Sequence, residues 1–480
     1  MTAHRTRVEL FLGKGGVGKT TLACADAVAA AHAGSKVLIA SVDQAHSLGD
    51  ALGFHFPHDP GTITGITSVL PGLDVIEVDS LALLEDRFRE VVTTLSHGAG
   101  HRHGLVDRGS EHGFDITALD PAELTGLPGV QELLVLVEIA QFAADADWDV
   151  IVVDCPPSAD MLRLVTAPET LLHYLDRVWP PHARAMSVAG TDLRTAVLAH
   201  TVERIAKAVG EVRDLLADRR RTGACLVTVA EQVAVAESAR VRSAAALLGL
   251  RLDAVVVNKI LPPVPPPSSR AEAENPAVRW YSERRAEQLE VLAQLRESMC
   301  GVRVLVAEHT GREPIGPSSL ARLSCHGVAR DEHGATGSDD SAKPGAGRSD
   351  GDSSVRALML GANQTDDDRE PRDRVHEDRP GDVPDSGAPE VRWESGSGLH
   401  SVYTLRMHLP VVDPATLRLG RVEDDLIVGA DGVRRRVRLA PVLRRCAVEG
   451  AELDRGRLLV RFRPDPHSWP DAREGHGHGQ

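Results

Sequence analysis

The feature that most constrains the fold is the run Gly13-Lys14-Gly15-Gly16-Val17-Gly18-Lys19-Thr20. It follows a short apolar segment, residues 8–12, and precedes an alanine-rich stretch, Lys19–Ala33, that Gly34 is placed to end as a helix C-cap. Glycines let backbone N–H groups surround an oxyanion, and the start of a helix adds its dipole. The pattern GxxxxGKT between a strand and a helix therefore predicts the phosphate-binding loop (P-loop) of a nucleotide hydrolase.

The loop residues divide the predicted tasks among them. We expect Lys19 to reach the β- and γ-phosphates and the Thr20 hydroxyl to ligate Mg²⁺, so the predicted cofactors are ATP and Mg²⁺. The alternative is a glycine turn that happens to precede a helix, and the position between a strand and a helix disfavours it. The full set predicted to hold the nucleotide is Gly13, Gly15, Gly16, Val17, Gly18, Lys19, Thr20, Thr21 and, at a distance, Asn258.

Asp43, Asp154 and Asn258 each follow a short apolar segment. The carboxyl ends of parallel strands meet at one edge of a sheet, next to such a loop. We predict that Asp43 activates or orients the attacking water, that Asp154 holds Mg²⁺ through water, and that Asn258 bonds the edge of the base. Asp43 and Asp154 alone are each equally typical of a helix N-cap or a turn, but together, at the ends of successive strands, they favour a site. For Asn258, an asparagine that forms a turn is the strong rival interpretation.

Short apolar segments alternate with helix-length segments along the first 323 residues, which predicts an α/β fold with a doubly wound, mostly parallel sheet buried on both faces. Two spans interrupt this rhythm, Leu81–Leu127 and Arg184–Asp218, and we interpret them as helical insertions that contact a client or partner. The apolar segments are residues 8–12, 36–40, 73–78, 150–153, 224–229, 254–257 and 302–306.

The chain changes character after Leu323. Residues 330–397 carry 17 acidic and 9 basic side chains and few large apolar ones. Such a segment buries too little apolar surface to offset the entropy of ordering it. We therefore predict an ATPase domain at residues 1–323 and a disordered acidic linker at 324–397.

A period-two alternation of apolar and polar residues starts at Tyr403 and continues to Phe462, with turn pairs at Asp431-Gly432 and Arg455-Gly456. Alternation of this kind, broken by turns, is typical of short strands with one buried face. It predicts a small all-β sandwich at residues 398–465, followed by a flexible tail at 466–480.

Composition excludes several classes of function. The net charge of −15 disfavours nucleic acid as a partner. No stretch approaches the roughly 18 apolar residues of an integral membrane segment, and Met1 leads directly into a strand with no room for a signal peptide. Six dispersed cysteines without a CxxC pair predict neither a disulfide framework nor a zinc site. We expect a cytoplasmic protein.

Weaker signals have ordinary explanations. Cys24, Cys155 and Cys225 are not spaced for arsenite and are better interpreted as small buried apolar residues. The Arg434–Arg436 run suggests an anionic surface as a partner. However, only six of the 54 basic residues are lysines, so arginine runs are expected in any case.

Lys14 is an extra lysine that an ordinary P-loop does not need. With it the loop resembles the KGGVGKT signature of the deviant P-loop ATPases, which include MinD/ParA-type partitioning ATPases, nitrogenase iron protein and the ArsA-like family. In those relatives this lysine crosses a dimer interface to the partner's nucleotide. The resemblance implies a homodimer in which Lys14 is catalytic together with Asp43 and Lys19.

The more specific resemblance is to the ArsA-like family, which contains arsenite-pump ATPases and ATPases that target tail-anchored membrane proteins. It covers about Arg7–Leu323. The C-terminal part resembles the small-heat-shock-protein-like sandwich of some bacterial members. The motifs that carry these resemblances are Asp43–Asp50, Leu127–Glu132, Asp154–Arg163, Asn258, Tyr403–Pro410, Val433–Val442 and Leu458–Arg463.

The chain departs from the family motifs at several positions, namely Gln44, Cys155-Pro156, Ala159 and Asp160. The last two stand where the family often has Gly-His, which implies either slower sensing of the γ-phosphate or a bacterial subfamily. The absence of CxxC gives no support to the zinc-linked dimer of the eukaryotic targeting factors.

Together these features predict an ATP-hydrolysing homodimeric switch that couples hydrolysis to conformational change in an unknown protein or anion client. The rival interpretation is a binding or chaperone module with little turnover, and a MinD/ParA-like partitioning role is the second enzymatic choice. Because every nucleotide motif precedes Leu323, truncation there is expected to leave a folded ATPase.

Overall fold

The computed structural model describes residues 5–42, 47–56, 65–77, 130–188, 193–265, 267–270, 274–299, 302–323, 325–327, 389–409, 412–454 and 456–469. Several predictions fall outside these residues. They are the roles of Asp43 and Gln44, the whole of the Leu81–Leu127 insertion, most of the acidic linker and most of the predicted tail.

A nine-stranded sheet forms the centre of the described N-terminal part, in the order β3-β4-β2-β5-β1-β6-β7-β8-β9. The seven inner strands are parallel, whereas β3 and β9 pair antiparallel at the two edges. The predicted mostly parallel sheet is confirmed. The strands are β1 (Arg7–Gly13), β2 (Val37–Ser41), β3 (Thr67–Leu70), β4 (Leu73–Glu77), β5 (Val150–Asp154), β6 (Thr222–Val229), β7 (Leu252–Ile260), β8 (Arg303–Glu308) and β9 (Cys325–Gly327).

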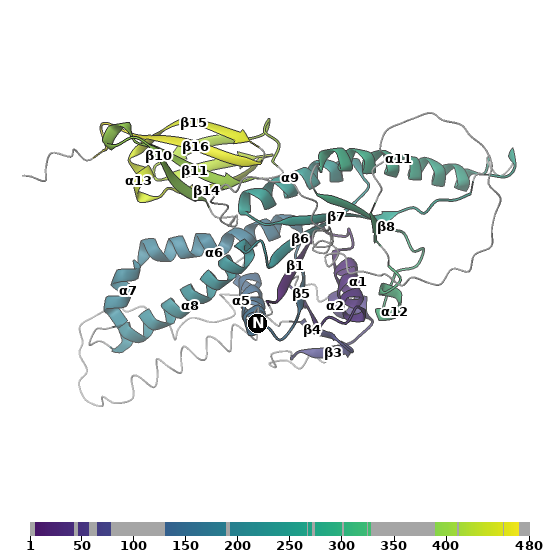
Figure 1. Cartoon of the computed structure of the whole chain (residues 1–480). Helices are drawn as coiled ribbons and strands as arrows, with labels where there is room; N and C mark the ends of the chain where they lie inside the picture. Colours follow the sequence, from purple (N-terminus) through teal and green to yellow (C-terminus); the bar gives the residue numbers. More distant parts are fainter. Residues whose placement is uncertain are drawn as a thin grey trace, which may run out of the picture.

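Helices cover both faces of this sheet, so the inner strands read as continuous apolar runs. On one face α1, α2 and α12 pack on the strands around Phe11, Ile39 and Val152; on the other face lie α5, α6, α8 and α9, around Leu10, Ile151 and other buried residues (Figure 1). These helices are α1 (Lys19–His32), α2 (Ser47–Leu52), α5 (Val130–Asp145), α6 (Ser158–Val178), α8 (Leu193–Ala217), α9 (Gln232–Leu248) and α12 (Pro317–Leu320). A further helix, α11 (Pro276–Ser298), packs beside β7.

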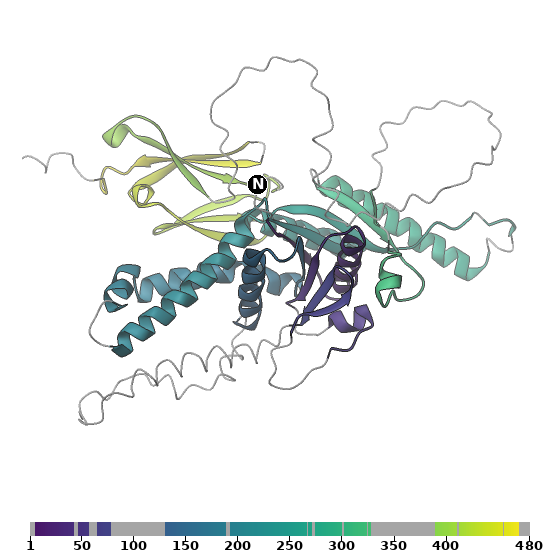
Figure 2. The same ribbon diagram turned by 60° about the horizontal axis from the view of Figure 1, so that its bottom comes forward.

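The second predicted insertion is a helical arm rather than one helix. The long helices α6 and α8 extend away from the sheet, and α7 (Pro181–Val188) joins their far ends (Figures 1 and 2). The insertion therefore begins before Arg184, because α6 already leaves the sheet.

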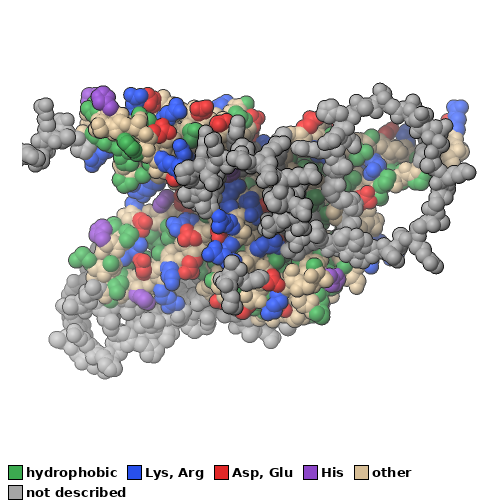
Figure 3. Space-filling model, viewed as in Figure 1, with side chains coloured by type: hydrophobic (Ala, Val, Ile, Leu, Met, Phe, Trp, Pro, Cys, Tyr) green, Lys and Arg blue, Asp and Glu red, His purple; other side chains and the backbone are tan. Residues whose placement is uncertain are grey.

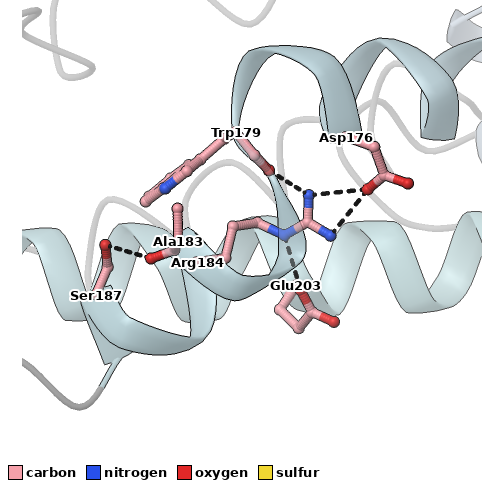
Figure 4. Close-up of polar contacts among 6 residues, drawn as sticks. All are labelled: Asp176, Trp179, Ala183, Arg184, Ser187 and Glu203. Carbon is pink, nitrogen blue, oxygen red and sulfur yellow. Dashed lines mark hydrogen bonds and ion pairs between the residues drawn. The ribbon is translucent and has the colours of Figure 1, made fainter. Parts of the chain in front are cut away.

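One buried arginine holds the tip of this arm together. The Arg184 side chain is only 5% exposed and donates to the Trp179 carbonyl at 2.7 Å, to Asp176 at 3.3 Å and to Glu203 at 3.0 Å (Figure 4). These contacts join α6, α7 and α8. The planar guanidinium is suited to this task since it presents several donors in fixed directions.

The C-terminal part, residues 389–469, is a sandwich of two antiparallel sheets that we call the β-module. Its core contains Leu405, Val428, Val460 and Phe462, all at most 2% exposed. One sheet has the order β10-β11-β16-β15 and the other β12-β13-β14. The strands are β10 (Glu390–Ser395), β11 (Val402–His408), β12 (Arg418–Val422), β13 (Asp425–Ala430), β14 (Val433–Arg438), β15 (Cys446–Asp454) and β16 (Arg457–Pro464).

Two elements lie outside the predicted domain boundaries. β9 pairs with β8 beyond Leu323, and β10 pairs with β11 before residue 398. Both are short edge strands that bury one side at most, so they lack the alternation that marks the inner strands. The residues given to the linker therefore include one strand of each domain.

The β-module packs directly on the ATPase domain. Ala246 and Leu247, at the end of α9, are 2% and 0% exposed and belong to the same apolar cluster as the core of the β-module (Figure 1). None of the helices in the described ranges combines the length and apolarity that crossing a membrane requires.

Candidate functional site

Strand β1 delivers the phosphate loop to the carboxyl edge of the sheet, and α1 starts from it at Lys19. Gly16 and Gly18 take φ values of 79° and 94°, the left-handed region that favours glycine. At Gly18 a β-carbon would also lie 2.4 Å from Asn258 Nδ2. The backbone conformation of the loop therefore requires glycine at positions 16 and 18, independently of any bound phosphate.

Lys19 is 6% exposed, and its ammonium donates to the Lys14 carbonyl at 3.4 Å. This bond folds the lysine back over the loop. A fixed cation at the start of a helix attracts a polyanion such as a nucleotide phosphate.

Three oxygen-bearing side chains meet at the first turn of α1. The Thr20 hydroxyl donates to Asp154 Oδ2 at 2.7 Å and lies 3.2 Å from the Ser47 hydroxyl. Asp154 ends β5 and is fully buried. Oxygen donors are what Mg²⁺ prefers, so the residues present fit this ion. Ser47 was not predicted, although it lies in the Asp43–Asp50 motif.

Asn258 reaches the loop rather than standing apart from it. Its Nδ2 donates to the Val17 carbonyl at 2.8 Å, and its Oδ1 accepts from the Lys259 N–H at 2.8 Å. The amide therefore ties β7 to the phosphate loop, a role that sequence reasoning missed. The predicted bond to the base remains a prediction.

Lys259 and Gln288 are two further residues that no motif marked. Lys259 has φ of 60°, unusual for a residue with a side chain, and its ammonium donates to the Gly16 carbonyl at 3.2 Å. Gln288, from α11, donates to the Lys259 carbonyl and accepts from the Leu261 N–H. This side chain supports the unusual backbone at Lys259, because it bonds the Lys259 carbonyl and the Leu261 N–H that follows.

Lys14 occupies the outer lip of the loop. Its side chain is 61% exposed and its ammonium lies 3.9 Å from Glu237 of α9. Lys14, Glu237 and Ser158 line a small hollow between the loop, α6 and α9. Lys19 and Lys14 thus face different surroundings: one is enclosed by its own loop, and the other is open to solvent.

Beneath the loop, Glu9 of β1 and Asp26 of α1 are buried together and hydrogen-bonded. Burial, and then the neighbouring Asp26 carboxyl, raise the pKa of Glu9 well above its ordinary value, while Arg7 at 3.0 Å opposes the rise. Burial also raises the pKa of the Cys24 and Cys225 thiols. Cys155 is buried too, as predicted for these three cysteines.

Comparison with known families gives two matches. Residues 6–326 match the family model of the anion-transporting ATPases, ArsA_ATPase, and residues 400–462 match that of an HSP20-like domain found in ArsA. The first match covers the sheet as far as His326 in β9, and the second lies within the β-module.

Relatives extend these matches over the chain. Protein Rv2184c of Mycobacterium tuberculosis is 41% identical over 98% of this chain and 99% of its own length. The uncharacterized protein SCO2128 of Streptomyces coelicolor is 30% identical over 97% of this chain and 100% of its own length. A Prosthecochloris vibrioformis protein, whose name describes an arsenical pump-driving ATPase, is 28% identical over 53% of this chain and 61% of its own length.

Proposed function

The chain belongs to the ArsA family of anion-transporting ATPases and is an ATPase, and on that premise we propose that it works as a nucleotide-switched homodimer acting on a protein client. The observation that carries the proposal is the joining of Lys19, Thr20 and Asp154 at the start of α1. A buried cation next to paired oxygen ligands is the arrangement that binds a nucleotide with its metal.

Thr20 and Asp154 would hold Mg²⁺, with Ser47 beside them. When bound, the ion would neutralise phosphate charge. Lys19 binds the β- and γ-phosphates, and the loop N–H groups fix their orientation. Asp43 orients the attacking water, and Asn258 anchors the loop through Val17 while it faces the base.

The position of Lys14 supports the homodimer. Its ammonium is exposed at the lip of the loop, whereas Lys19 already serves the phosphates of its own chain. A second ammonium at this place is explained by a phosphate that arrives from a facing copy of the chain. It would stabilise charge in the transition state as an arginine finger does.

The magnesium-binding end of β5 leads directly into the first helix of the arm, so hydrolysis can change the position of the arm. Asp154 ends β5, and α6 starts four residues later at Ser158, so a change at the carboxylate moves the base of the arm. The arm carries large apolar side chains in contact with solvent, among them Tyr174 at 63% and Met186 at 75% exposed, and Figure 3 shows apolar atoms on its surface. Exposed apolar side chains occur on all three helices of the arm, which favours a protein client.

The thiols give no support to an arsenical as the ligand. Arsenite is held by converging thiolates. Cys24 and Cys225 are buried, and their raised pKa values keep them protonated. The name of the Prosthecochloris protein therefore supports an ATPase activity for this chain, but not an arsenical as its ligand.

Mixed dimers test the proposed switch. We expect Lys14→Ala to retain ATP binding but lose turnover. Asp43→Asn is expected to bind ATP and to lose about a hundredfold in kcat, the usual size for a group that orients or deprotonates water. Mixing the two variants restores one complete site, because the Lys14→Ala chain keeps Asp43 and receives Lys14 from its partner.

Lys19→Ala is the control, since it is expected to lose ATP binding in calorimetric titration and to rescue neither variant. If mixed dimers form and no activity returns, Lys14 acts within its own chain. If the wild-type protein binds ATP without turning it over, the chain is a binding module instead.

A further inference from the structure

Helix α9 contacts the phosphate loop near one end and the β-module at the other. Glu237, in its second turn, lies 3.9 Å from the Lys14 ammonium. Ser243 and Leu247, in its last turns, contact the β-module. One continuous helix, Gln232–Leu248, therefore touches both the phosphate loop and the β-module.

The contact with the β-module is well built. The tip of the β13–β14 hairpin, Asp431-Gly432, has φ values of 49° and 81°, as expected for an Asp-Gly hairpin turn. The Asp431 carboxylate accepts a hydrogen bond from the Ser243 hydroxyl of α9. Ala246 and Leu247 complete the contact, because they are buried in the apolar cluster of the β-module.

Arg435 of β14 connects this interface to a second helix. Its side chain is 13% exposed, donates to the Leu247 carbonyl at the end of α9, and lies 3.8 Å from Glu169 of α6. A cation at a helix C-terminus is favourable, because the last carbonyls carry partial negative charge. Arg435 therefore fixes α9 against α6, the helix that starts beside Asp154.

We propose that the β-module is an intramolecular brake on the ATPase: by fixing α9 it keeps Glu237 paired with Lys14 and so withholds Lys14 from a nucleotide on a facing copy of the chain. This inference rests on the proposed role of Lys14. Release of the β-module from α9, for example on binding a client, would free Lys14 and raise turnover.

The strength of the Lys14–Glu237 pair suits a brake. The two side chains are 61% and 25% exposed, so the pair is screened by solvent and is easily broken. Pairs of this kind change an equilibrium by about two- to fivefold. The brake would therefore slow the enzyme without abolishing turnover.

Two substitutions at opposite ends of α9 test the proposal. Glu237→Gln removes the partner of Lys14 and leaves the β-module in place. Arg435→Leu loosens the β-module and leaves Glu237 in place. Each is expected to raise kcat by about two- to fivefold at saturating ATP with little change in KM. Arg436→Leu is the matched control, because this neighbour on β14 is 70% exposed and pairs with Asp425 of its own sheet; it should match the wild type.

Hydrogen exchange of residues 238–248 reports whether α9 has been released. Faster exchange in Arg435→Leu with unchanged or lower turnover would overturn the proposal, since the β-module would then only support the fold. Unchanged turnover in Glu237→Gln would do so as well, and this variant does not disturb the interface. If Lys14→Ala turns over normally, the failure lies in the proposed dimer mechanism; if Lys14→Ala is inactive and Glu237→Gln changes nothing, the brake alone fails.

Discussion

At the scale of single residues, Glu9 is the side chain whose environment is least expected. It lies in the strand that delivers the phosphate loop, 4% exposed, where an apolar residue would pack without cost. Its bond to Asp26 requires a proton on one of the two carboxyls. The pair therefore stores a proton within the core beneath the site.

This arrangement predicts how stability depends on pH. The folded pKa of Glu9 is raised above its ordinary 4.5, so the protonated form stabilises the fold at low pH. That contribution is lost as pH rises from about 4.5 through the folded pKa, at about 1.4 kcal/mol for each unit of the shift. Glu9→Gln keeps the uncharged form at every pH. We expect its melting temperature to exceed that of the wild type at neutral pH, by a margin that grows from pH 5 to pH 8.

Scanning calorimetry across this range measures the effect. The control is Glu283→Gln, because Glu283 is 71% exposed and pairs weakly with Arg279 on the same helix. Equal melting temperatures for Glu9→Gln and the wild type at pH 8 would mean that Arg7 holds Glu9 ionised.

Residues in motifs were predictable, and residues placed by the tertiary fold were not. Thr20 and Asp154 meet as predicted, since a P-loop and the end of a neighbouring parallel strand must lie together. Glu237 and Gln288 stand in helices with no motif of their own. Their roles depend on which way a helix turns against the sheet, and no local pattern encodes that.

At the scale of elements, the helical arm depends on Arg184. Arg184→Met removes the hydrogen bonds to Asp176, Glu203 and the Trp179 carbonyl. Hydrogen bonds to charged groups contribute about 1.5–3 kcal/mol each, and Asp176 and Glu203 are half exposed, so we expect the tip of the arm to lose about 2 kcal/mol of local stability. Hydrogen exchange across α7 should accelerate, while the sheet stays protected.

Arg177→Met provides the comparison, because Arg177 lies on the same stretch of α6 and is exposed. Equal exchange in α7 for both variants would show that apolar packing holds the tip. The client contact proposed for the arm adds a second readout, since a loosened tip should bind client more weakly at unchanged ATP affinity.

The strands that the sequence did not reveal are β3, β9, β10 and β15, and all four lie at sheet edges. An edge strand pairs on one side and buries little, so neither an apolar run nor a regular alternation is required of it. In β15 only Cys446 is fully buried. The inner strands were found from their apolar runs, and this difference explains why β9 and β10 fell among the residues given to the linker.

At the scale of the whole molecule, the two domains share an interface, so we expect the N-terminal part to be less stable alone than in the full chain. A chain ending after Leu323 would lose β9 and expose Ala246 and Leu247. We expect a chain ending after Gly327 to fold and bind ATP but to melt at a lower temperature than the ATPase domain of the full chain. Scanning calorimetry of the full chain and of the chain ending after Gly327 measures this difference. Equal melting temperatures of the ATPase domain in the two proteins would show that the interface contributes no stability.

The scarcity of lysine has a practical consequence at this same scale. The chain has six lysines, and three of them, Lys14, Lys19 and Lys259, gather at the phosphate loop. Arginine supplies nearly all other positive charge, so half of the side-chain amines stand at one place. A reagent that acylates amines would act as a covalent footprint of this place: mass spectrometry of the labelled peptides would separate the enclosed Lys19 from the open Lys14 without any engineered probe.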